Sequence, residues 1–341
     1  MRRRRKSSVP ELLADPFAEC ERLITRAPLQ LLGARIRFES NSPQALRLVD
    51  AAYAGLPSHR LSARSPTLRV ALRLATAAPR PARAEPAAVT MLSGAGWVGG
   101  ASDGSNVALI CVPQRAALLA LSPRLLHYPY HARYELLEFA VYTLASRVQQ
   151  LVPLHGACVG LNGRGVLLMG ASGAGKSTLA LLSAMQGFDF VAEDSVFVSP
   201  RSMLATGVAN FLHVRADSLR WLPRLARAAI RRSPIIRRRS GVNKFEIDLR
   251  RGPYSLASAP LKIGAVVFLS SEPARQRALL SRLPAARLRA QLAATQAYAA
   301  NQPRWADFCA QVARVDAFCL RRAAHPLQSV QALAALLGSG R

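Results

Sequence analysis

The sequence has few acidic residues, almost no lysine, no paired cysteines and no long apolar run. Of its 341 residues, 46 are Lys or Arg and only 19 are Asp or Glu, which gives a formal net charge of +27. Arginine supplies nearly all of the positive charge, because the only lysines are Lys6, Lys176, Lys244 and Lys262. Hydrophobic residues nevertheless make up 50% of the chain, a share that predicts a globular protein with a large core and excludes a disordered one.

The basic composition has two explanations. It can indicate a partner that is an acidic protein, a membrane surface or a nucleic acid, or it can reflect biased coding in the host. The arginines are spread along the chain and are not confined to one tail, which favours biased coding. We therefore expect no nucleic-acid partner, and an acidic partner that binds the basic surface stays an alternative.

The cysteines and the apolar runs bear on the cellular compartment. Five cysteines form no CxxC pair and are odd in number: Cys20, Cys111, Cys158, Cys309 and Cys319. Their pattern argues against a disulfide framework and against a cysteine-based zinc site, and it fits a reducing compartment. The basic N-terminus has no apolar segment behind it, and no apolar run approaches the ~18 residues that a membrane helix needs. We predict a cytoplasmic protein without a transmembrane segment.

One segment carries a complete nucleotide-binding motif. It reads Gly170-Ala171-Ser172-Gly173-Ala174-Gly175-Lys176-Ser177, followed by Thr178, and it fits G-x-x-x-x-G-K-[ST]. The apolar run "GVLLMG" before the motif predicts a strand, and "KSTLALLSAMQG" after it predicts a helix that ends at Gly187. In this order, backbone N–H groups and the helix N-terminus bind the phosphates of ATP. Lys176 would contact the β- and γ-phosphates, and the Ser177 hydroxyl would bind Mg²⁺.

The acidic pair Glu193 and Asp194 follows the apolar segment "FDFVA". Side chains alternate along a strand, so both acids reach one site only if the strand ends there. Two adjacent carboxylates predict two roles, because one can bind Mg²⁺ and the other can accept a proton from an attacking hydroxyl. Asp194 is our first choice as the metal ligand, with Glu193 as the alternative, and the sequence does not decide between them.

His155 belongs to the segment "LHGACVGLNGRGV", which predicts a hairpin with its turn at "NGRG". This hairpin would place His155 in the strand next to the phosphate-loop strand, near the γ-phosphate. A lone histidine on an apolar strand is usually a core residue, but the neighbouring motif and acidic pair favour catalysis. The predicted catalytic residues are His155, Lys176, Glu193 and Asp194.

These motifs, from Leu154 to about Val198, resemble the catalytic domain of HPr kinase/phosphorylase. That family phosphorylates a serine of the phosphocarrier protein HPr, and its nucleotide domain is related to phosphoenolpyruvate carboxykinase. The resemblance implies that His155 and the first acid, Glu193, assist removal of the proton from the substrate serine. It also implies that Ser177 and an acid bind Mg²⁺, and that the chain forms homo-oligomers.

The sequence departs from the family in two places. The family usually has two aspartates where this chain has Glu193 and Asp194, and its downstream Gly-Arg-Asn signature, linked to phosphorylase activity, is absent. The segment "RRSPIIRRRSGVNKFEIDLR" stands there instead. Neither HPr as the acceptor nor a reversible reaction is therefore implied. The arginine-rich stretch 224–251 is either a basic loop over the active site or a solvated insertion, and its "KFEIDL" predicts a strand.

The predicted fold class is α/β (α+β overall). We expect a basic, loosely ordered arm at 1–28, a strand-rich N-terminal region at 29–130, and a P-loop domain with a mixed sheet and flanking helices at 131–341. In the N-terminal region "LLGARIRFES", "TLRVALRLA", "VTMLSGA" and "NVALICVP" predict strands, and "SPQALRLVDAAYAG" predicts a helix. The segment "LKIGAVVFLSSE" predicts a further strand, whereas the segments 275–299 and 303–323 predict helices.

Two classes of function fit these observations. In the first, the chain is an ATP-dependent serine kinase that transfers the γ-phosphate of MgATP to a peptide or small protein, with a small-molecule kinase as a variant. In the second, it is a nucleotide-dependent binding protein without phosphoryl transfer. His155 beside the acidic pair favours transfer, because a switch needs no proton acceptor for a hydroxyl.

Overall fold

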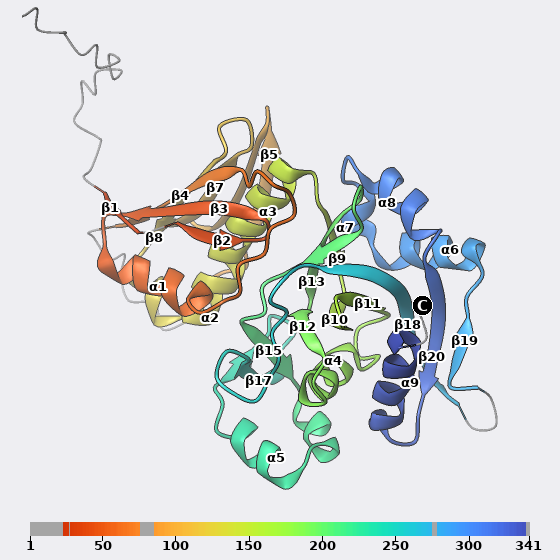
Figure 1. Cartoon of the computed structure of the whole chain (residues 1–341). Helices are drawn as coiled ribbons and strands as arrows, with labels where there is room; N and C mark the ends of the chain where they lie inside the picture. Colours follow the sequence, from red (N-terminus) through yellow and green to blue (C-terminus); the bar gives the residue numbers. More distant parts are fainter. Residues whose placement is uncertain (1–22, 27, 76–84, 275–277, 339–341) are drawn as a thin grey trace, which may run out of the picture.

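The described part of the chain folds around two mixed β-sheets, which Figure 1 shows on opposite sides of the molecule. The computed structural model describes residues 23–26, 28–75, 85–274 and 278–338. Most of the predicted arm at 1–28 lies outside these residues. Among the described residues, no helix has both the length and the apolar character that crossing a bilayer requires.

The first sheet has the strand order β1-β3-β4-β8-β7-β6-β5, with β2 paired to β3. The pairs β3–β4 and β4–β8 are parallel, and the other neighbours are antiparallel. The strands are β1 (Ile24–Thr25), β2 (Leu29–Leu31), β3 (Ala34–Ser40), β4 (Thr67–Leu74), β5 (Thr90–Gly94), β6 (Trp97–Asp103), β7 (Asn106–Cys111) and β8 (Ala116–Leu121). All four segments that predicted strands in this region form them.

One face of this sheet is buried under two helices, α1 (Pro43–Tyr53) and α3 (Glu138–Gln149). The alternation in β3 explains the arrangement, because Ile36 and Phe38 are buried in the first core while Arg35 and Arg37 between them are exposed. The helix α1 begins after Ser42, whose hydroxyl accepts a hydrogen bond from the backbone N–H of Gln44 at 3.1 Å.

The helix α3 ends a longer helical segment that links the two sheets. Before it come η1 (Leu125–His127), α2 (Pro129–His131) and the π-helical stretch η2 (Ala132–Leu137). Leu136 and Leu137 of η2 are buried in the core of the first sheet. The predicted division of the chain at residue 130 stays a prediction, although the helical segment after it packs on the first sheet.

The second sheet contains the phosphate-loop strand. Its order is β12-β10-β11-β18-β14-β13-β9, and β20 pairs with both β18 and β19. The strands are β9 (Val152–His155), β10 (Ala157–Leu161), β11 (Arg164–Met169), β12 (Asp189–Ala192), β13 (Ser195–Ser199), β14 (Leu204–Thr206), β18 (Leu261–Pro273), β19 (Leu280–Arg282) and β20 (Asp316–Arg322). The pairs β11–β18 and β18–β20 are parallel and the other pairs between its described strands are antiparallel, so the sheet is mixed as predicted.

Helices cover both faces of this sheet. On one face lie α4 (Lys176–Met185) and α9 (Pro326–Gly338), and on the other lie α6 (Ala285–Thr295), α7 (Ala297–Ala300) and α8 (Trp305–Val312). Val166 and Leu168 of β11 face the first group, whereas Leu167 and Met169 face the second. A strand buried on both faces reads as a continuous apolar run, which is why "GVLLMG" lacks polar alternation.

Two predictions at the C-terminal end were partly wrong. The segments 275–299 and 303–323 contain the predicted helices α6 and α8, but each also contains a strand, β19 and β20 respectively. β20 lies beside β18 in parallel, with Ala317 paired to Val266, and β19 pairs with β20 in turn. Sheet pairing over a long chain separation overrode the local helix propensity of these alanine- and leucine-rich segments.

A small third sheet follows in the order β15-β17-β16, with β15 (Phe211–Val214), β16 (Ile235–Arg237) and β17 (Asn243–Asp248). The helical stretches η3 (Ala216–Trp221) and α5 (Arg224–Ile230) lie between β15 and β16. The arginine-rich stretch therefore includes a helix and a β16–β17 hairpin, and "KFEIDL" forms β17 except for its last residue.

Candidate active site

The phosphate loop joins β11 to α4, as the sequence predicts. Gly170, Gly173 and Gly175 have φ values of +138°, +82° and +100°, which glycine adopts without strain. A Cβ at Gly170 would lie 3.0 Å from the carbonyl oxygen of Leu269 on the neighbouring strand. The glycines thus let the loop turn sharply and pass close to β18, with Ala171, Ser172 and Gly173 exposed at its tip.

Lys176 begins α4 and folds back over the loop. Its Nζ donates to the carbonyl oxygens of Gly170 at 2.8 Å and Ala171 at 3.1 Å. Burial lowers the pKa of Lys176, while the nearby charges of Asp194 and Glu193 oppose this change. The lysine, the loop and the acidic pair therefore form one electrostatic site. The Thr178 hydroxyl lies one residue beyond Ser177 and is 2.8 Å from the Ser218 hydroxyl.

Glu193 lies beside the phosphate-loop serine. The Ser177 hydroxyl donates to Oε1 of Glu193 at 2.5 Å. The other carboxylate oxygen, Oε2, is buried and accepts no hydrogen bond from any described residue. Burial, together with the charge of Asp194, raises the pKa of Glu193. A buried carboxylate oxygen without a partner, next to a hydroxyl, matches the oxygen ligands that Mg²⁺ prefers, so the residues present fit this ion.

Asp194 turns away from Glu193 because the chain bends between β12 and β13. Asp194 has φ +76°, a left-handed conformation that aspartate tolerates better than most residues. Its carboxylate accepts hydrogen bonds from the Tyr134 hydroxyl and, at 3.0 Å, from Nη2 of Arg238. The strand β12 thus ends before the acidic pair, and the two carboxylates contact different partners.

His155 completes the contacts of Asp194. Its Nδ1 lies 3.2 Å from Oδ1 of Asp194 and 3.2 Å from the backbone oxygen of the same residue. Both neighbours are acceptors, so Nδ1 carries the proton and Nε2 is the nitrogen able to accept one. The hydrogen bond to Asp194 raises the pKa of His155, and 53% of its side chain is exposed.

The same contacts keep Asp194 charged. Burial favours the neutral acid, but the hydrogen bond from His155 and the positive charge of Arg238 outweigh it. The pKa of Asp194 is therefore held below its ordinary value. A carboxylate that accepts three hydrogen bonds is a poor proton acceptor and a good orienting group.

The position of His155 in the sheet differs from the prediction. The hairpin β10–β11 forms with the expected turn, but His155 lies before it in β9, which pairs with β13 and not with the phosphate-loop strand. The chain changes partners at Gly156, where a Cβ would lie 2.7 Å from the carbonyl oxygen of Leu168. This change places His155 opposite Ser195, directly after the acidic pair.

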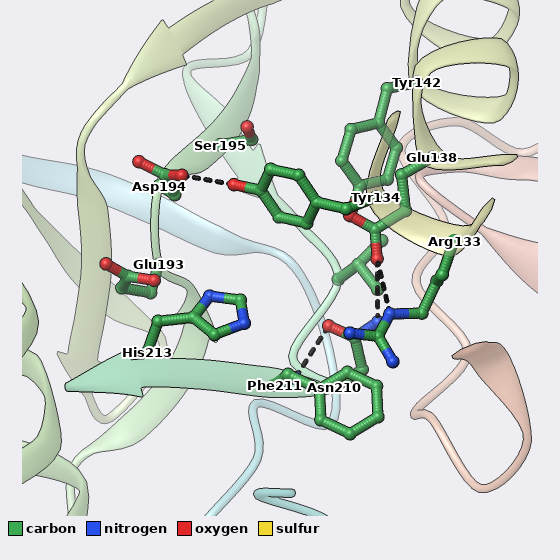
Figure 2. Close-up of a pocket in the computed structure, with 11 residues that line it drawn as sticks. Arg133, Tyr134, Glu138, Tyr142, Glu193, Asp194, Ser195, Asn210, Phe211 and His213 are labelled. Atoms are coloured by element: carbon green, nitrogen blue, oxygen red, sulfur yellow. Dashed lines mark hydrogen bonds and ion pairs between the residues drawn. The ribbon is translucent and has the colours of Figure 1, made fainter. Parts of the chain in front are cut away.

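Four residues of the site were not predicted from the sequence. The Gln296 side chain holds the backbone of His155. Its Oε1 accepts from the His155 N–H at 2.8 Å, and its Nε2 donates to the His155 carbonyl oxygen at 2.9 Å. Tyr134 and Arg238 hold Asp194. For the arginine-rich stretch that contains Arg238, the sequence had left open a basic loop over the site or a solvated insertion. His213 lies with Tyr134 and both acids around a small polar cavity of about 20 Å³ (Figure 2).

A comparison with protein families identifies the segment that carries the site. Residues 146–215 match the family model described as the HPr Serine kinase C-terminal domain. The match contains His155, the phosphate loop and the acidic pair, so this segment is related to HPr kinase, and the predicted resemblance is confirmed. One similar solved structure is the HPr(Ser) kinase/phosphatase from Coxiella burnetii, at 14% identity and a TM-score of 0.26, over 53% of this chain and 93% of that chain. No curated protein matches the sequence.

Proposed function

We propose that this chain is an ATP-dependent serine kinase that transfers the γ-phosphate of MgATP to a hydroxyl of a peptide or small protein. The observation that carries the proposal is the His155–Asp194 pair beside the phosphate loop. A protein that only senses ATP needs the loop, but it does not need an oriented, solvent-exposed imidazole with a free Nε2. The relation of residues 146–215 to HPr kinase supports the same reaction.

The phosphate groups of ATP would bind at the N-terminus of α4. Backbone N–H groups at a helix N-terminus bind anions, and the helix dipole favours negative charge. Lys176 would exchange the carbonyl oxygens of Gly170 and Ala171 for phosphate oxygens and stabilise the charge that develops during transfer. The proposed cofactor-binding residues stay those predicted from the sequence, 170–178.

Ser177 and Glu193 would hold Mg²⁺. The hydroxyl and the carboxylate are already in contact at 2.5 Å, and the unpaired Oε2 of Glu193 offers a further oxygen. When bound, Mg²⁺ would supply positive charge next to the phosphates and would favour the charged form of Glu193. Of the two arrangements left open by the sequence, the contacts favour Glu193 as the metal ligand.

Asp194 and His155 would act on the acceptor. Asp194 keeps the proton on Nδ1 of His155, so Nε2 is left to accept the proton of the attacking serine hydroxyl. Phosphoryl transfer passes through a loose transition state, so orientation of the hydroxyl contributes as much as proton removal. The cytoplasmic location and the homo-oligomer predicted from the sequence stay predictions.

Labelled ATP tests the proposal directly. Purified protein, γ-labelled ATP and Mg²⁺ are incubated with serine-containing peptides and with host lysate, beside Lys176→Ala and His155→Gln variants. Label on a discrete serine that depends on both residues supports the kinase. Calorimetric ATP binding that Lys176→Ala abolishes, with no transfer to any acceptor, would replace the kinase with a nucleotide-dependent binding protein.

A further inference from the structure

A side chain from outside the kinase-related segment reaches into the candidate active site. Tyr134 belongs to η2, twelve residues before the matched segment begins at residue 146. Its hydroxyl donates to Oδ2 of Asp194, the oxygen that also accepts from Arg238. Figure 2 shows the ring between the helical segment and the acidic pair, with the hydroxyl directed at Asp194.

The ring of Tyr134 is fixed on several sides. It stacks on Tyr130 with 5.4 Å between the ring centroids, and its ring meets His213 edge-on at 5.8 Å. The guanidinium of Arg238 lies 4.9 Å from its centroid. Burial raises the pKa of Tyr134, and the charge of Asp194 raises it further, so the hydroxyl keeps its proton and stays a donor.

The backbone that carries Tyr134 is held by the first sheet. Leu136 and Leu137 of the same stretch are fully buried in the core of that sheet. Arg133, also in η2, is paired with Glu246 of β17 in the third sheet. Insertions of π-helix within α-helices recur at functional sites because they redirect one side chain from the regular helical face.

We infer that Tyr134 is a positioning residue, through which the segment packed on the first sheet holds Asp194 and thereby orients His155. This inference rests on the proposed function of the His155–Asp194 pair. It gives the N-terminal part of the chain a role in the reaction, because the active site of residues 146–215 is incomplete without a side chain fixed by the first sheet.

A pair of tyrosine variants tests the inference. Tyr134→Phe keeps the stacked ring and removes only the hydroxyl that Asp194 accepts from. Tyr130→Phe is the matched control, because the Tyr130 hydroxyl lies in the same stack and accepts from Arg238 at 3.2 Å. Among the described residues, the tyrosine that donates to Asp194 is Tyr134. Thermal melting of both variants checks that the fold is retained.

Two readouts separate positioning from general damage. Nitrogen-15 NMR of the imidazole reports the tautomer of His155, and we expect Tyr134→Phe to lower the share of the form protonated on Nδ1. We also expect kcat to fall on the order of tenfold while KM for ATP stays unchanged, because the hydroxyl acts on Asp194 and not on the nucleotide.

The outcomes are distinguishable from failure of the kinase proposal. An unchanged tautomer with an unchanged kcat in Tyr134→Phe, or an equal loss in Tyr130→Phe, would overturn the positioning role. If the wild-type protein transfers no phosphate to any acceptor, the kinase proposal fails, yet the tautomer measurement still decides whether Tyr134 orients the His155–Asp194 pair.

Discussion

Replacement of Asp194 by asparagine removes one charge and preserves the size of the side chain. The carboxylate accepts from three donors: the His155 Nδ1–H, the Arg238 guanidinium and the Tyr134 hydroxyl. Asparagine offers one oxygen and one NH₂ group, so at least one donor must face another donor. The Arg238 side chain, 18% exposed, also loses its anion.

The magnitude follows from these lost contacts. In Asp194→Asn, Nδ1 of His155 keeps the backbone oxygen of residue 194 as an acceptor but loses the charged carboxylate oxygen. The share of imidazole protonated on Nε2 therefore rises, and this tautomer cannot accept the serine proton at Nε2. A positioned general base contributes about 10²–10⁴-fold, so we expect kcat to fall by about that factor. KM for ATP should stay near the wild-type value, because Lys176 and Ser177 keep their contacts. The free energy of unfolding should fall by about 1–3 kcal/mol through the unpaired donors.

The assay is single-turnover transfer from γ-labelled ATP, with urea unfolding of each variant. Asp189→Asn is the matched control, because Asp189 begins β12, the strand that leads to Asp194. Its carboxylate accepts from the Ser255 hydroxyl at 2.9 Å, outside the Asp194 contacts. A wild-type kcat in Asp194→Asn, or a raised KM for ATP with kcat unchanged, would refute the role of the carboxylate in orienting His155.

Three further predictions follow from single observations. Because the pKa of His155 is raised and only neutral imidazole accepts a proton, kcat should rise with pH through that pKa and then level off; a flat profile from about pH 6 to 9 would contradict this. The pKa of Glu193 is raised on folding, so its charged form destabilises the folded state above that pKa. Glu193→Gln should therefore raise the melting temperature measured without Mg²⁺ at about pH 8 and leave it unchanged at about pH 4. In a titration, the same variant should bind Mg²⁺ about 10–100-fold more weakly. A Cβ at Gly160 would lie 2.2 Å from the Arg164 carbonyl oxygen, so Gly160→Ala should cost about 1–3 kcal/mol in urea unfolding, whereas Gly104→Ala, with open space around it, should cost nothing measurable.

Local signals in the sequence predicted the nucleotide half of the site. The phosphate loop requires a strand, glycines with positive φ and a helix N-terminus in immediate succession, so all of its parts are neighbours in the chain. The acidic pair could also be predicted from the sequence. Side chains alternate along a strand, so both carboxylates reach one site only if β12 ends before them, and it ends at Ala192. The open question was which acid performs which role, and no local pattern bears on it.

Contacts between distant residues distinguish the surroundings of the two acids, and our proposal of their roles rests on these contacts. Glu193 meets Ser177 and Asp194 meets His155, 16 and 39 residues away respectively, while Tyr134 and Arg238 approach Asp194 across 60 and 44 residues. The same holds for β19 and β20, whose sequences favour helix but whose edges complete the second sheet. The position of His155 also depends on a distant contact. The chain changes its pairing partner at Gly156, so His155 lies in β9, which pairs with β13.

The sequence by itself thus determined the phosphate loop, the acidic pair, the mixed α/β class and the relation to HPr kinase, since each depends on residues within a few turns or one strand. Only the tertiary structure decided which carboxylate faces the serine of the loop, which tyrosine and arginine hold the other, and which glutamine clamps the backbone of the histidine. Those contacts depend on how two sheets and the helix between them pack, and packing over such separations leaves no periodic signal in the chain.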